Sequence, residues 1–126
     1  MPFSYYIDTS AGILFLIGEG VIDQADRIRT MRAWLSDPQF RPGLDTLCDF
    51  TAAASTPTMM ELRELVTIMK QNAPAIGRAR LAMATGKPIT FGVARQFQSL
   101  ASSEGVPIEI RLFTTRAEAF AWLRPD

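Results

Sequence analysis

The chain has 126 residues, of which 48% are hydrophobic, and this is the size and composition of one folded domain rather than of a disordered protein. Its formal net charge is zero, whereas a protein that binds nucleic acid through its phosphates needs a basic surplus. It contains no histidine, which excludes Ser-His-Asp and Cys-His nucleophiles and every zinc site that uses histidine. Its single cysteine, Cys48, excludes an internal disulfide and a CxxC redox pair.

The first half of the chain predicts a hairpin, a helix and a buried strand. Residues 5–8 and 13–20 are expected as antiparallel strands, joined by a tight turn at Gly12. Asp23 is a typical N-cap for the following helix, which ends at Asp37-Pro38. Its spacing places Ala25, Ile28, Met31 and Leu35 inward, and Asp26, Arg27 and Arg29 toward water. Residues 44–49 are expected as the third strand and residues 50–58 as a loop.

The second half alternates helices and strands. Thr58 and Glu61 form a capping box that opens a helix, whose inward stripe carries Met59, Leu62, Leu65, Val66 and Met69. Residues 80–85 are the fourth strand, and Pro88 suits the first turn of the next helix. Gly105 is placed to end that helix, and residues 108–113 form the fifth strand. A second capping box, Thr115 with Glu118, opens the last helix.

The resulting element order is β-β-α-β-α-β-α-β-α. Strands that are separated by helices require parallel crossovers, whereas the short first turn allows only antiparallel pairing. The sequence therefore predicts an α/β fold with a mixed five-stranded sheet, in which an N-terminal antiparallel hairpin joins otherwise parallel strands. The whole of residues 1–126 is expected to form this one domain.

Three stretches of the chain resemble the SpoIIAA-like (STAS) superfamily of small bacterial proteins, also grouped as STAS/SEC14-like. They are residues 35–49 (LSDPQFRPGLDTLCD), residues 91–97 (FGVARQF), and residues 106–113 (VPIEIRLF) followed by residues 118–123 (EAFAWL). The resemblance covers nearly the whole chain. It implies a regulatory module like the anti-sigma factor antagonists, in which a partner kinase phosphorylates a serine between the third strand and the next helix.

The phosphorylation pattern of that family, roughly Asp-x-Ser-x-x-Asp-Ser-Ser-Gly, aligns with residues 49–57. Asp49 and Thr51 match its first Asp and Ser, and Ser55 and Thr56 match its Ser pair. The resemblance thus implies Ser55 and Thr56 as the switch. Ala54 replaces the second Asp and Pro57 replaces the Gly, and proline removes an N–H that a phosphate would use. The alternative is that these hydroxyls are turn and capping groups.

A small apolar ligand is the second hypothesis for function. Ligands of open α/β sheets bind beyond the carboxyl ends of the strands, here residues 49–58 and 85–90. Met59, Met60, Met69 and Met83 are flexible apolar side chains that suit either a lipid-like ligand or an ordinary core. The expected partner or ligand surface comprises Asp49, Thr51, Thr58, Met59 and Arg95, and Arg95 either pairs with Asp49 or faces water.

These observations predict a non-enzymatic protein with no metal, no cofactor and no nucleic-acid partner. Its expected partner is another protein, such as an anti-sigma factor or a kinase-like regulator, or a small apolar ligand. The N-terminus lacks the basic and apolar regions of a signal peptide, and no apolar run approaches the ~20 residues of a membrane span, so a cytoplasmic protein is expected. A homodimer through the hairpin edge or the helix faces stays open.

Overall fold

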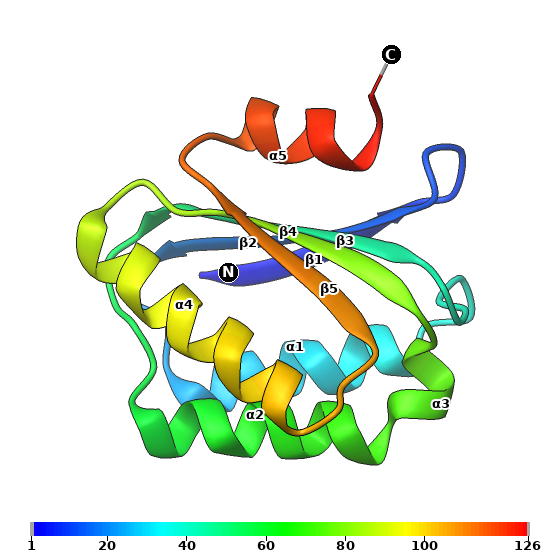
Figure 1. Cartoon of the computed structure of the whole chain (residues 1–126), viewed down its shortest axis with the longest axis horizontal. Helices are drawn as coiled ribbons and strands as arrows, with labels where there is room; N and C mark the ends of the chain where they lie inside the picture. Colours follow the sequence, from blue (N-terminus) through cyan, green and yellow to red (C-terminus); the bar gives the residue numbers. More distant parts are fainter. Residues whose placement is uncertain (1, 126) are drawn as a thin grey trace.

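A five-stranded sheet with strand order β1-β2-β3-β4-β5 organises the computed structural model, which describes residues 2–125 (Figure 1). β1 pairs antiparallel with β2, and every other pairing is parallel. The predicted α/β architecture is therefore confirmed. The strands are β1 Phe3–Asp8, β2 Ile13–Gly20, β3 Asp45–Ala53, β4 Ala79–Ala84 and β5 Ile108–Phe113. The helices are α1 Gln24–Leu35, α2 Met59–Gln71, α3 Ala73–Ile76, α4 Pro88–Ser103 and α5 Arg116–Leu123.

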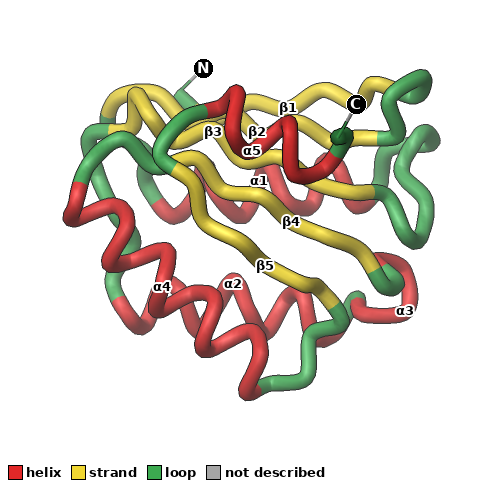
Figure 2. The backbone as a smooth tube through the Cα atoms, turned by 45° about the horizontal axis from the view of Figure 1, so that its top comes forward, coloured by secondary structure: helices red, strands yellow, loops and turns green. Residues whose placement is uncertain are grey.

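The helices cover the two faces of the sheet unequally. α1, α2 and α4 lie together beneath one face, and α5 lies alone on the other (Figures 1 and 2). The larger core fills the three-helix side and includes Leu16, Cys48, Val66, Met83 and Phe97. The smaller core lies beneath α5 and is built around Phe15, Leu47, Ala82 and Leu123. Because successive strand residues point to opposite faces, each buried strand contributes to both cores. None of the helices in the described chain is long and apolar enough to cross a membrane.

Local capping signals locate the helix starts correctly. The Asp23 side chain accepts the Asp26 backbone N–H, as expected for an N-cap. Both predicted capping boxes are present, at Thr58 with Glu61 and at Thr115 with Glu118. Each of these contacts involves residues three apart in the chain, which is why they are readable from sequence.

The structure corrects three expectations. β3 does not end at residue 49, because Ala52 and Ala53 pair with Glu19 and Gly20 of β2 beyond a β-bulge. Residues 50–53, predicted as a loop, are therefore strand. A short helix, α3, follows α2 where only a helix stop was expected.

The third correction concerns the orientation of α1. Its buried residues are Arg27, Thr30 and Trp34, whereas Ala25 is exposed. Met31 and Leu35 pack against the core as expected, but the centre of the inward face is rotated from the one predicted, and Arg27 lies inside rather than toward water. Trp34, with the largest apolar surface of the helix, sets this orientation by packing against Phe40 with ring centroids 5.0 Å apart.

Candidate functional site

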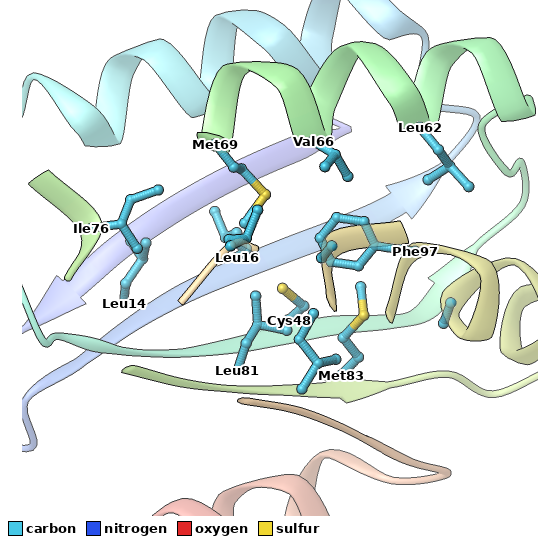
Figure 3. Close-up of a cluster of buried hydrophobic side chains, with 14 of the residues drawn as sticks. Leu14, Leu16, Cys48, Leu62, Val66, Met69, Ile76, Leu81, Met83 and Phe97 are labelled. Atoms are coloured by element: carbon cyan, nitrogen blue, oxygen red, sulfur yellow. The ribbon is translucent and has the colours of Figure 1, made fainter. Parts of the chain in front are cut away.

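An apolar cavity of about 140 Å³ lies between the sheet and helices α1, α2 and α4. Its lining is almost entirely hydrophobic and includes Leu16, Cys48, Leu62, Met69, Met83 and Phe97. Figure 3 shows how these side chains meet: Leu62 and Met69 descend from α2 toward Cys48 and Met83 on the strands, with Phe97 entering from α4. Protein interiors seldom leave a void larger than a water molecule, so a chamber of this size is a candidate binding site.

Part of the cavity wall is polar, and its residues are connected through the backbone carbonyl of Ile22. Ile22 O accepts hydrogen bonds from Arg27 Nη2 at 2.9 Å and from Ser55 Oγ at 3.1 Å. The Ile22 N–H in turn donates to Ser55 Oγ at 2.8 Å. Arg27, Ser55 and the adjacent Thr56 all line the cavity, and we call these three residues the polar end. The remaining length of the cavity offers mainly carbon surface.

The side chain of Ile22 packs on the sheet at Gly18. Ile22 lies two residues beyond β2, and its side chain covers Gly18 of that strand. A Cβ at Gly18 would lie 2.7 Å from both Ile22 Cδ1 and Phe50 Cδ1. A larger residue at this position would displace the Ile22 and Phe50 side chains, so glycine leaves the space that they occupy against the sheet.

Arg27 is a buried cation with incomplete neutralisation. Only 8% of the residue is exposed. Besides the Ile22 carbonyl, its guanidinium donates to Gln24 Oε1 at 3.2 Å, and the nearest carboxylate oxygen, Glu61 Oε1, lies 3.8 Å from Nη1. Glu61 Oε1 also accepts the Thr58 N–H at 2.9 Å, so it serves two groups at once. Burial lowers the pKa of Arg27, and the charges of Glu61, Asp23 and Asp26 oppose that shift.

The predicted switch residues lie in the segment that leads from β3 to α2. Ser55 and Thr56 are half-buried and precede the N-cap Thr58, so the chain does enter a helix there, three to four residues later. The Ser55 hydroxyl is already used by both its hydrogen bonds to Ile22. Thr58 is exposed and occupied by its capping box.

Asp49 and Thr51 lie on the opposite face of the sheet from the cavity. Their strand positions alternate with Cys48 and Phe50, which face the three helices. The Asp49 carboxylate accepts the Thr51 backbone N–H and hydroxyl at 3.0 and 2.7 Å, and pairs with Arg116 of α5 at 3.6 Å. The sequence pattern that united Asp49 and Thr51 with Ser55 and Thr56 therefore does not form one site.

The remaining predicted surface residues are dispersed. Arg95 is exposed on α4 and does not reach Asp49, whose cationic partner is Arg116, so the solvated alternative for Arg95 holds. Met59 is 41% exposed at the start of α2 and Met60 is 82% exposed. Of the four methionines considered, only Met69 and Met83 line the cavity. Residues 2–125 include no cluster of three or more metal-ligating side chains.

Arg27 and Trp34 are two residues of α1 that line the cavity and were not expected there. Arg27 was expected toward water, and the predicted inward stripe through Ala25 and Ile28 did not include Trp34. An alternative stripe through Arg27, Thr30, Met31 and Trp34 follows the same spacing of three, four and seven residues. The stripe that contains Trp34, the bulkiest apolar side chain of α1, is the face that the structure buries.

Cys48 lines the cavity as a neutral thiol, and its reactivity gives a direct check on burial. Burial raises the pKa of Cys48 to about 12, with a smaller contribution from Asp49. Because the thiolate is the reactive form, folded protein at pH 8 should react with 5,5′-dithiobis(2-nitrobenzoate) about a thousandfold more slowly than protein unfolded in guanidinium chloride. The absorbance of the released thiolate measures both rates, and no second cysteine contributes. Equal rates in both states would show that Cys48 is accessible.

Comparison with known proteins supports the fold. No protein-family model matches the chain, and no curated protein matches it by sequence. Among solved structures, it is similar to an uncharacterised protein of the DUF3478 family from Shewanella loihica PV-4, described as having a SpoIIAA-like fold. The TM-score is 0.60 at 14% sequence identity, over 96% of this chain and 91% of that one. The predicted resemblance is thereby confirmed at the level of architecture: the chain has a SpoIIAA-like fold.

Proposed function

We propose that this protein is a non-enzymatic module that binds a small apolar molecule in the cavity between the sheet and helices α1, α2 and α4. The observation that carries this proposal is the cavity itself, about 140 Å³ with a predominantly hydrophobic lining. An engineered apolar cavity of about 150 Å³ in another protein stays dry and binds benzene or xenon. The space therefore suits an aromatic ring or a short branched chain rather than a full-length lipid.

Energetics also favour occupancy. Side chains that line an unfilled apolar space lack dispersion contacts on one side, which lowers the stability of the folded protein. A ligand that fills the space restores the missing dispersion contacts without exposing new surface. Binding of such a ligand thus recovers part of a cost that the folded protein already carries.

Toluene tests this proposal. Millimolar toluene should raise the midpoint of thermal unfolding, because a ligand that binds only the folded state stabilises it. The substitution Ala94→Leu adds side-chain volume at a residue that lines the cavity, and it should abolish the rise. Ala117→Leu, at an exposed position on α5, is the matched control and should keep it.

Calorimetric titration measures the same binding directly. Failure of toluene to stabilise or bind the wild-type protein would contradict the proposal. So would an equal effect in the Ala94→Leu protein, since the ligand would then bind elsewhere. Native mass spectrometry of freshly purified protein is expected to show an added small-molecule mass when the natural ligand survives purification.

A second candidate is a regulatory module that binds another protein and is switched by phosphorylation of Ser55 or Thr56. The observation that favours it is the pair of hydrogen bonds between Ser55 Oγ and the Ile22 backbone. A phosphoryl group on that oxygen would remove its donor proton and add about −1.5 to −2 charges, so the present contact would break. Modification would then move the segment before α2 out of its present position and change the surface that a partner meets.

Hydrogen exchange at the Ile22 amide tests this switch. Ser55→Asp replaces the hydroxyl by a carboxylate, which cannot donate to the Ile22 carbonyl and repels it, so exchange of this amide should be about tenfold or more faster through opening of the segment. Ser102→Asp, at an exposed position on α4, is the control and should leave it unchanged. Slow exchange in Ser55→Asp, together with no phosphate on Ser55 or Thr56 by mass spectrometry of the native protein, would rule the switch out.

A further inference from the structure

We infer that the ligand of this cavity is a small carboxylic acid with an apolar body, whose carboxylate pairs with Arg27 at the polar end. This inference rests on the proposed ligand-binding function and specifies the chemical class of the ligand. It requires a cation with free hydrogen-bond donors, a position for that cation in the cavity wall, and a cavity volume that limits the size of the rest of the ligand.

Arg27 supplies the cation. A guanidinium carries five N–H donors, and the hydrogen bonds seen here go to Ile22 O and Gln24 Oε1, both uncharged acceptors. Glu61 lies at 3.8 Å, beyond hydrogen-bond distance, and is itself a third exposed to solvent. Asp23 caps α1 and Asp26 pairs with Arg29, so neither carboxylate is committed to Arg27. A buried charge with such loose compensation gains strongly from a carboxylate of its own.

The location follows from the shared carbonyl of Ile22. Arg27 Nη2 and Ser55 Oγ both bond to this oxygen, so the guanidinium and the cavity-lining hydroxyl lie side by side. Thr56, next in the chain, also lines the cavity and adds a second hydroxyl. Arg27 and these two hydroxyl groups therefore lie together, and most of the remaining lining is apolar. This polarity matches a molecule with an anionic head and a hydrocarbon body.

Charge and volume select carboxylate over phosphate. The other arginine that borders the cavity, Arg80, directs its guanidinium to Asp45 and to the carbonyls of Trp122 and Leu123 near α5. A single cation is then available, and a phosphate ester would bring about two negative charges beside Glu61. A carboxylate brings one charge in the planar geometry that a guanidinium binds best. The cavity of about 140 Å³ leaves space for a body near the size of a benzene ring.

Benzoate and benzamide test the inference on the wild-type protein. They have the same shape, and only benzoate carries the charge. By calorimetric titration, benzoate should bind about 10- to 100-fold more tightly, the range expected for a charge-assisted pair in a buried site. Hexanoate and hexanamide should repeat the preference with an aliphatic body. Ala94→Leu should weaken all four, which places the binding in the cavity.

Substitutions of Arg27 assign the preference to its charge. Arg27→Met should reduce benzoate binding to the level of benzamide while benzamide changes little, and Arg27→Lys should retain part of the preference. Arg29→Met removes a cation from the exposed side of the same helix and should leave both affinities unchanged. If Arg27→Met does not fold, the ratio of benzoate affinity to benzamide affinity, compared between the wild type and Arg27→Lys, still tests the role of Arg27.

The outcomes separate this inference from the function on which it rests. Equal binding of benzoate and benzamide, or a preference that survives in Arg27→Met, would overturn the carboxylate assignment and leave the apolar site standing. Binding of toluene without binding of benzoate would do the same. Absence of binding for toluene, benzoate and benzamide together would overturn both.

Discussion

The packing of three helices over one face of a twisted sheet is the constraint on which the structure depends. α1, α2 and α4 bury that face, while α5 alone buries part of the other (Figures 1 and 2). On the α5 side, the buried core includes the small residues Ala82, Ala84 and Ala119, which allow close contact between α5 and the sheet. On the three-helix side, the side chains of α2 and α4 reach the strands without filling the space between them. The chamber is therefore a property of how the layers meet, not of one loop.

The polar end shows how the fold joins this chamber to the carboxyl ends of the strands. The Ile22 backbone links Arg27 of α1 to Ser55 in the segment before α2, and Gly18 leaves space for the Ile22 side chain on the sheet. Arg27 and Ser55 meet there although they are 28 positions apart in the printed sequence. Ligand binding and Ser55 modification would therefore act on the same small group of contacts, and a bound anion and a phosphoryl group on Ser55 would compete for Arg27.

Elements defined by neighbouring residues were predictable from sequence. The capping boxes at Thr58 and Thr115 depend on side chains three residues apart, and the parallel strand order follows from the helices that separate the strands. The extension of β3 to Ala53 was not predictable, because it depends on pairing with Gly20 from a distant strand across a bulge. The burial of Arg27 depends on a rotation of α1 that its alternative apolar stripe also permits.

The candidate site was predictable only in part. Ser55, Thr56, Met69 and Met83 were singled out from sequence and do line the cavity. Asp49 and Thr51 were grouped with them by chain position, but alternation along β3 places these two residues on the α5 face. Residues that are close in sequence at the end of a strand can therefore lie on different faces of the sheet. A cavity between three helices and the sheet cannot be predicted from any single segment of the sequence.

A crystal structure determined under xenon pressure would show directly whether an empty apolar space exists between the sheet and the three helices. Xenon binds apolar cavities that lack water, and its electron density marks their position without any assumption about the natural ligand. We expect a xenon site bounded by Cys48, Leu62 and Phe97. Ordered water filling that space, or side chains closed over it while xenon binds elsewhere in the crystal, would contradict the existence of an apolar binding site in this protein.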